Sequence, residues 1–182
     1  MRGHKVMGKK NFEKLLQRHK TESAEKKDFW EKQKNEWLAF IKIFHYHIES
    51  WFAPYQDEDK LYYKYRDIKI TEEHIGTYTS KIMEVDFAGQ KLTLEPLGTL
   101  LIGTKGRIDM EGPRGRIQFI LADKDSKGMN VVVSTQKDSQ SANQLKEPNW
   151  TWKIVLRESN KISYAEFTEE NFFDALMEVV NG

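Results

Sequence analysis

The chain has 182 residues, 38% of them hydrophobic, and a net charge of +1, which fits one domain of ordinary size with a substantial core. It contains no cysteine, so disulfides, thiol nucleophiles and thiolate metal sites are excluded. No apolar run approaches the roughly 20 residues of a membrane span and no secretory signal is visible, so we expect a cytoplasmic protein that does not enter a membrane.

Charge is distributed unevenly along the chain. The first twenty residues hold seven basic side chains against Glu13 alone, and we expect residues 1–10 to form a flexible basic tail. The last fifteen residues hold four acidic side chains and no basic one. Such termini can attract each other or face a partner, although two solvated ends are the simpler interpretation.

Residues 29–52 have the apolar period of a helix. At 100° per residue one face collects Trp30, Trp37, Phe40, Ile41, Phe44, Ile48, Trp51 and Phe52. The side chains on or near the opposite face are Lys42, Tyr46, Glu49 and Ser50. The stripe ends at Pro54, which cannot donate to the helix ladder. We therefore predict a long amphipathic helix, with the helical region covering residues 11–53.

The residues before this stripe leave an alternative open. Phe12, Leu15 and Leu16 lie in phase with it, but residues 17–28 contain no large apolar side chain. The helix either breaks near Thr21 and Ser23, which can cap a new one, or continues as an exposed rod. The same gap leaves open whether this segment packs on its own domain or on another chain.

After Pro54 the apolar period changes to two, which predicts strands over residues 61–167. Ala88-Gly89 marks a tight hairpin that sets Val85 opposite Leu92. A second hairpin turns at residues 112–115 and sorts its side chains by face. The core face holds Ile108, Met110, Ile117 and Phe119, and the polar face holds Arg107, Asp109, Glu111, Arg116 and Gln118. Two hairpins of this kind indicate an antiparallel sheet.

Further strands are expected at residues 99–102, 129–135, 150–157 and 162–167, with a polar loop over residues 136–149. Thr168 is placed to cap a C-terminal helix over residues 168–181, with Phe167 and Phe172 as a hydrophobic staple. The predicted fold is α+β, as one domain over residues 11–182. The long N-terminal helix packs on a twisted antiparallel meander of about seven strands, closed by the C-terminal helix.

No catalytic, cofactor or metal motif is identified. The glycines from Gly98 to Gly103 lack the Gly-Lys-Ser/Thr order of a phosphate loop. On a helix His45 and His47 point apart, so only His45 and Glu49 share a face, too few ligands for zinc. Asp109 with Asp123, Asp125 and Lys127 resembles a nuclease set, but the sequence around Asp123 is that of a solvated turn.

Two polar features are candidates for binding. The basic residues Lys105, Arg107, Arg114 and Arg116 gather on the polar face and tip of the second hairpin, where they can grip phosphates or carboxylates. Cross-strand pairing with Glu111 and Asp109 is the structural explanation for the same residues. Residues 62–66 alternate aromatic and basic side chains, which then face opposite ways and cannot act on one ligand.

These observations favour a non-enzymatic interaction protein: a small binding, immunity or accessory subunit acting through a surface towards another protein. One alternative is nucleic-acid binding by the basic tail and the arginine hairpin, which predicts a steep salt dependence. The other is a small-ligand or catalytic cavity between sheet and helix, with His47 or Tyr46 supplying polar contacts. The partner and the oligomeric state are left open by the sequence.

Overall fold

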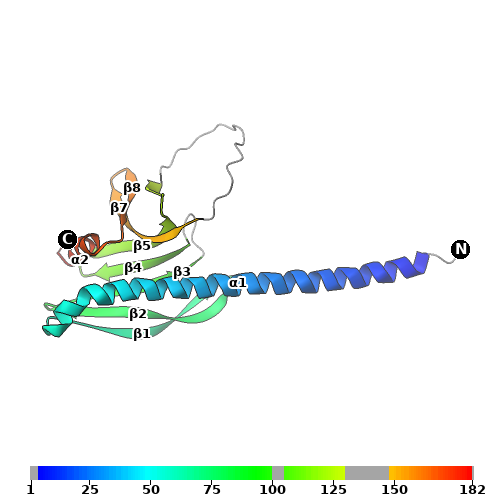
Figure 1. Ribbon diagram of the computed structural model, residues 1–182, viewed down its shortest axis with the longest axis horizontal. Coiled ribbons are helices and arrows are strands. Elements are labelled where there is room, and N and C mark those ends of the chain that lie inside the picture. The colour runs from blue at the N-terminus through cyan, green and yellow to red at the C-terminus, as the bar shows by residue number, and fades with distance from the viewer. Residues whose placement is uncertain (1–3, 100–104, 130–147, 182) are drawn as a thin grey trace.

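The computed structural model describes residues 4–99, 105–129 and 148–181 and shows an α+β fold, as predicted (Figure 1). The eight strands form one antiparallel sheet in the order β1-β2-β3-β4-β5-β7-β8-β6, and β6 has only two residues. The elements are α1 (His4–Asp57), β1 (Leu61–Glu72), β2 (Gly76–Phe87), β3 (Gln90–Gly98), β4 (Gly106–Gly112), β5 (Gly115–Asp123), β6 (Gly128–Met129), β7 (Trp150–Glu158), β8 (Lys161–Glu166) and α2 (Glu169–Asn181).

Helix α1 has two parts with different surroundings. Its C-terminal part lies along the curved sheet, with β1 and β2 on one side of it and β4 and β5 on the other (Figure 1). Its N-terminal part extends away from the sheet, and every residue from Gly8 to Phe29 is exposed. The helix runs through Thr21 and Ser23 without a break. Residues 4–10, where we expected a flexible basic tail, are helical as well.

The end of α1 differs from the prediction. Pro54 lies inside the helix, which continues to Asp57. Proline removes one donor but leaves its own carbonyl free, so a final turn can follow it. Two backbone hydrogen bonds end the helix, from Lys60 N–H to the Tyr55 carbonyl and from Asp59 N–H to the Gln56 carbonyl, both 2.9 Å. Asp59 takes the left-handed conformation (φ 55°) of this C-terminal cap, a position where glycine is usual.

The predicted strand registers are confirmed. In the first hairpin Val85 pairs with Leu92 and Met83 with Leu94. In the second, Glu111 pairs with Arg116 and the turn residues are Pro113 and Arg114. Both hairpins have two-residue turns, so alternation alone fixes which side chains face the core.

Aromatic rings fill the space between α1 and the sheet. Phe44 is fully buried, with ring centroids 5.2 Å from Phe119, 4.9 Å from Trp152 and 5.0 Å from Phe167. Trp37 is also fully buried and lies 5.9 Å from Trp152. Tryptophans from helix and sheet therefore share the central layer. Burial of such large apolar surfaces is the main favourable term of this fold.

Helix α2 covers the sheet beside the C-terminal end of α1 (Figure 1). The Thr168 hydroxyl accepts a hydrogen bond from Asn171 N–H at 3.3 Å, which confirms the predicted cap. Phe167 and Phe172 pack edge to face at 6.3 Å as the predicted staple. The buried face of α2 consists of Phe172, Ala175, Leu176, Val179 and Val180.

Some predicted elements lie wholly or partly outside the described residues. They are most of the strand at residues 99–102, all but the start of the strand at 129–135, and residues 136–147 of the expected polar loop. Asp123 and Asp125 form a turn, as expected. Asp125 N–H donates to the Asp123 carboxylate at 3.0 Å, and Ser126 N–H donates to the Asp123 backbone carbonyl at 2.9 Å.

Candidate functional site

A cluster of paired charges occupies the polar face of the β4–β5 hairpin. The Asp109 carboxylate forms an ion pair with Arg107 Nε at 2.8 Å and accepts a hydrogen bond from Arg107 Nη2 at 3.2 Å. It also lies 3.7 Å from the Arg116 guanidinium. Arg116 also donates to Glu111 at 2.6 Å. The expected pairing of these arginines with Glu111 and Asp109 is therefore present. Arg107 and Arg116 each form an ion pair with a carboxylate of the β4–β5 hairpin.

Asp109 is the buried centre of this cluster. Only 6% of its side chain is exposed, and burial raises the pKa of its carboxyl above the usual range, with the two arginines opposing that shift. Arg107 is itself half-buried beside it. The pair Arg107–Asp109 consequently belongs to the structure of the hairpin, and Arg116 is the more exposed of the two arginines.

Of the other two basic residues proposed for this surface, Arg114 lies at the predicted tip of the hairpin, whereas Lys105 lies elsewhere. Arg114 is exposed at the turn, where its backbone N–H donates to the Val179 carbonyl of α2 at 2.9 Å. Lys105 is not on the polar face. Its side chain turns to α1, pairs with Glu36 and lies 5.7 Å from the Phe40 ring centroid. Lys105 was grouped with the arginines only because it is close to them along the chain. Its partner, Glu36, comes from a helix that is far away in the sequence.

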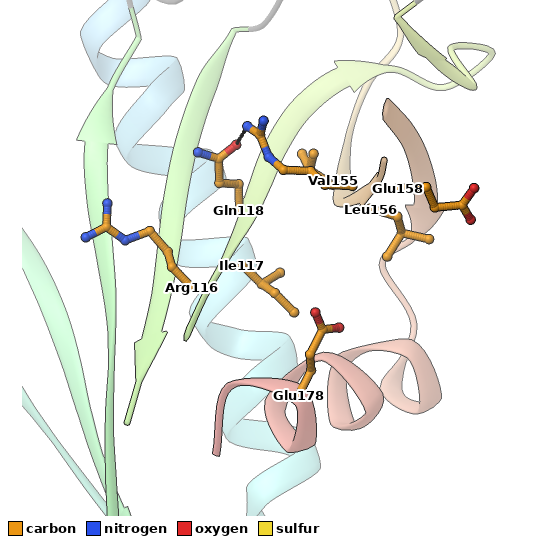
Figure 2. Close-up of a pocket in the computed structure, with 8 residues that line it drawn as sticks. Arg116, Ile117, Gln118, Val155, Leu156, Glu158 and Glu178 are labelled. Carbon is orange, nitrogen blue, oxygen red and sulfur yellow. Dashed lines mark hydrogen bonds between the residues drawn. The ribbon is translucent and has the colours of Figure 1, made fainter. Parts of the chain in front are cut away.

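A slot lies beside this cluster, where β5 and β7 separate. Their ladder stops at Phe119 and Ile154, although β5 runs on to Gly115 and β7 to Glu158. Between the separated strands is a hollow of about 440 Å³. Figure 2 shows it between the two strands, with α2 below. Its lining, which we call the β5–β7 slot, is Arg116, Ile117, Gln118, Val155, Leu156, Arg157, Glu158 and Glu178.

The slot combines an apolar floor with charges of both signs. Ile117, Val155 and Leu156 supply apolar surface, and Leu156 is 39% exposed. Arg157 donates to the Gln118 side chain at 2.8 Å, which bridges the slot. Arg157, in the strand expected at residues 150–157, was not among the candidate site residues. The pattern of β7 carries no signal for the place where its ladder ends.

His45 and His47 of α1 pack against aromatic rings. His45 is 8% exposed and its ring lies 4.9 Å from Tyr65. Burial lowers the pKa of His45 to about 4, so this imidazole is neutral at pH 7. His47 stacks on Trp51 at 5.7 Å. Among the residues that the structure describes, no three His, Asp or Glu side chains gather as metal ligands.

The aromatic–basic strand also divides as expected. In β1, Lys64 and Arg66 both reach Glu84, at 3.2 and 2.9 Å. On the other face the Tyr65 hydroxyl donates to Glu49 of α1. Glu49, assigned to the solvent side of the helix from the wheel, is thus half-buried and bonded. Rings and cations act on opposite sides of this strand.

The exposed part of α1 is the third candidate surface. Phe12, Leu15 and Leu16 are 59%, 62% and 55% exposed. They form one apolar cluster near the N-terminal end of a mainly polar segment. Within the described part of the chain, no helix has both the length and the hydropathy to cross a membrane. An apolar cluster on a charged, solvated helix is typical of a surface that binds another macromolecule.

Comparison with known proteins does not assign the chain to a family. No family model matches it, and neither a curated protein nor a solved structure does so. Its function is therefore inferred from its own residues and their geometry.

Proposed function

We propose that this chain is a non-enzymatic interaction protein that binds an extended segment of a protein partner in the β5–β7 slot. The observation that carries the proposal is the early end of the β5–β7 ladder, at Phe119 and Ile154. Each strand continues for four residues beyond that pair. Four residues of strand extend over about 13 Å, enough to pair with a short peptide.

Each strand keeps one edge paired and turns the other to the slot. Along this stretch β5 pairs with β4, and β7 pairs with β8. An unpaired strand edge presents N–H and C=O groups that can bond to an extended chain. The apolar floor of Ile117, Val155 and Leu156 adds contacts for the side chains of that segment. Backbone pairing thus supplies affinity, and the floor supplies selectivity.

The charges of the slot favour a peptide over a nucleic acid. Arg116 and Arg157 are accompanied by Glu158 and Glu178 in the same lining. Carboxylates beside the arginines repel a phosphate backbone, whereas a peptide with side chains of both signs can satisfy all four groups. Nucleic-acid binding keeps one supporting feature, the basic residues of the exposed part of α1.

The cavity alternative is not favoured by the packing between α1 and the sheet. Trp37, Phe44 and Phe119 are each 0% exposed and occupy that space with their rings. Tyr46, one of the polar groups considered for such a cavity, is 67% exposed on the outer side of α1. A hollow with a mixed polar and apolar lining lies instead between β5 and β7.

The proposal is tested by selecting binders from a random peptide library on the immobilised wild-type protein. We expect a family of extended peptides, and we expect Leu156→Trp to weaken their binding at least tenfold because the indole fills the slot. Met177→Trp is the matched control, since Met177 is an equally exposed apolar residue on α2 that does not line the slot. Affinities are measured by calorimetry.

Three results would count against the proposal. One is the absence of any enriched peptide, and another is equal loss of affinity in the two tryptophan variants. The third is retention of nucleic acid by the wild type with an affinity that falls steeply with salt.

Arg157→Glu is a suitable second variant, because Arg157 bonds only to Gln118 among the described residues. Arg107→Glu is unsuitable, because it leaves the buried Asp109 without its partner.

A further inference from the structure

The exposed part of α1, residues 8–29, is a single helix, and the described parts of the chain bury none of its residues. It is held by its own side-chain pairs, such as Arg18–Glu22 at 2.8 Å, and contacts with the sheet begin at Trp30. Trp30 stacks on His74 of the β1–β2 turn at 4.9 Å. Most of the stability of a helix in a protein comes from tertiary packing of its apolar face, which residues 8–29 lack within the described residues. A partner that covers its apolar residues would stabilise it.

The two halves of this segment carry opposite charge. Residues 9–20 have five basic side chains and one acidic one, a net charge of +4. Residues 21–31 have four acidic side chains (Glu22, Glu25, Asp28 and Glu31) and two basic ones, a net charge of −2. A helix with this distribution complements a second copy that runs in the opposite direction and repels one that runs parallel to it.

Apolar side chains lie in both halves. The first half holds the cluster of Phe12, Leu15 and Leu16. The second half ends at Phe29, which is 52% exposed and packs edge to face on Trp30 at 4.9 Å. There a hollow of about 490 Å³ is lined by Glu22, Glu25, Lys26, Phe29, Trp30 and His74. An apolar floor with an acidic rim suits an apolar cluster flanked by lysine and arginine.

We propose that the exposed parts of α1 from two copies of this chain pair antiparallel about a two-fold axis. The axis passes close to residues 21–23, midway between the two apolar groups. In this arrangement the Phe12–Leu15–Leu16 cluster of each copy lies at the Phe29–Trp30 hollow of the other. The contact is made twice by symmetry, so the assembly closes as a dimer. The β5–β7 slot is on the sheet and stays free in both copies.

The proposal is tested by light scattering and sedimentation of the full chain at micromolar concentration. The wild type is expected to have the mass of a dimer. The double variant Leu15→Glu, Leu16→Glu is expected to raise the dimer dissociation constant about a hundredfold or more. The reason is that two leucines that the dimer would bury become charged. Tyr46→Glu is the control: Tyr46 is exposed on the sheet-bound part of α1, so this variant is expected to remain dimeric. Thermal unfolding confirms that both variants keep the fold.

Orientation is tested by cross-linking, which is unambiguous because the chain has no cysteine of its own. With a short bismaleimide, the cysteine of Ser23→Cys is expected to cross-link to the same residue of the second copy, because both lie near the axis. Lys9→Cys is not, because antiparallel pairing separates the two copies of residue 9 by about 39 Å. Cross-linking at both positions would show a parallel pair and overturn the proposal. A monomeric wild type would overturn it too, including one that binds nucleic acid or another protein through this helix.

Discussion

At the residue scale, several side chains suggestive of function turn out to hold the fold together. Arg107 and Asp109 form a half-buried ion pair, and Lys105 fixes the start of β4 to α1 through Glu36. His45 and Tyr65 belong to the contact between α1 and β1. Removing one member of a buried charged pair costs more than the pair contributes, because the other charge is left unpaired. Binding tests must therefore use exposed residues such as Arg157 and Leu156.

Gly106 offers a sharp test of the contact between β4 and α1. A Cβ atom at this position would lie 2.3 Å from the ring of the fully buried Trp37. We expect Gly106→Ala to lower the free energy of unfolding by about 3 kcal/mol, because neither the ring nor the strand has room to move.

The control for this substitution is Gly115→Ala, in the same hairpin. Among the described residues other than its chain neighbours, no heavy atom lies within 4 Å of its added Cβ, so the change is expected to stay within about 0.5 kcal/mol of wild type. Urea unfolding measures both variants. Equal losses in the two would mean that Trp37 does not lie against β4 in solution.

His45 predicts a pH dependence of stability. Its pKa is lowered to about 4 in the folded chain by burial, from 6.5 when exposed. Between these values the unfolded chain binds the extra proton, so stability falls as pH decreases from 6.5 to 4, by about 3 kcal/mol from this group. Urea midpoints of wild type and His45→Phe across this range measure it. His45→Phe should have the shallower slope, and parallel curves would contradict the assignment.

At the element scale, periodicity predicted the elements and pairings, and local backbone geometry decided their ends. Alternation of apolar residues fixed the registers of both hairpins, because each has a two-residue turn. The end of α1 could not be predicted in the same way. The left-handed cap is Asp59, which lacks the signal of glycine, and Pro54 suggested an earlier end. Burial of Trp51 and Phe52 holds the chain helical up to the proline.

The β2–β3 turn gives a prediction at this scale. Ala88 and Gly89 have φ of 50° and 72°, the left-handed pair of a type I′ turn, where asparagine is favoured over alanine at the first position. We expect Ala88→Asn to raise the free energy of unfolding by about 0.5–1 kcal/mol. Ala39→Asn, at an exposed helical position of α1, should instead lower it by about 0.5 kcal/mol. Thermal unfolding of both variants measures this contrast, and a loss at both would contradict the turn assignment.

At the scale of the whole molecule, the sequence indicated the α+β fold and the polar face of the β4–β5 hairpin, but not the slot. Arg116 and Arg157 lie 41 positions apart in the chain and come together only because β5 and β7 are neighbours. The place where their ladder ends depends on the twist of the assembled sheet, for which a single strand carries no pattern. The extent of α1 beyond the sheet was an open alternative, because a solvated rod and a broken helix share the same polar residues.

The central claim is that the facing edges of β5 and β7 beyond Phe119 and Ile154 are open to a partner segment. Residue-resolved amide hydrogen exchange tests it most directly, in the free protein and with a selected peptide bound. We expect the amides of residues 115–118 and 155–158 that point across the slot to exchange quickly in the free protein and to become protected in the complex. Strong protection in the free protein, or no change when the peptide binds, would contradict the claim.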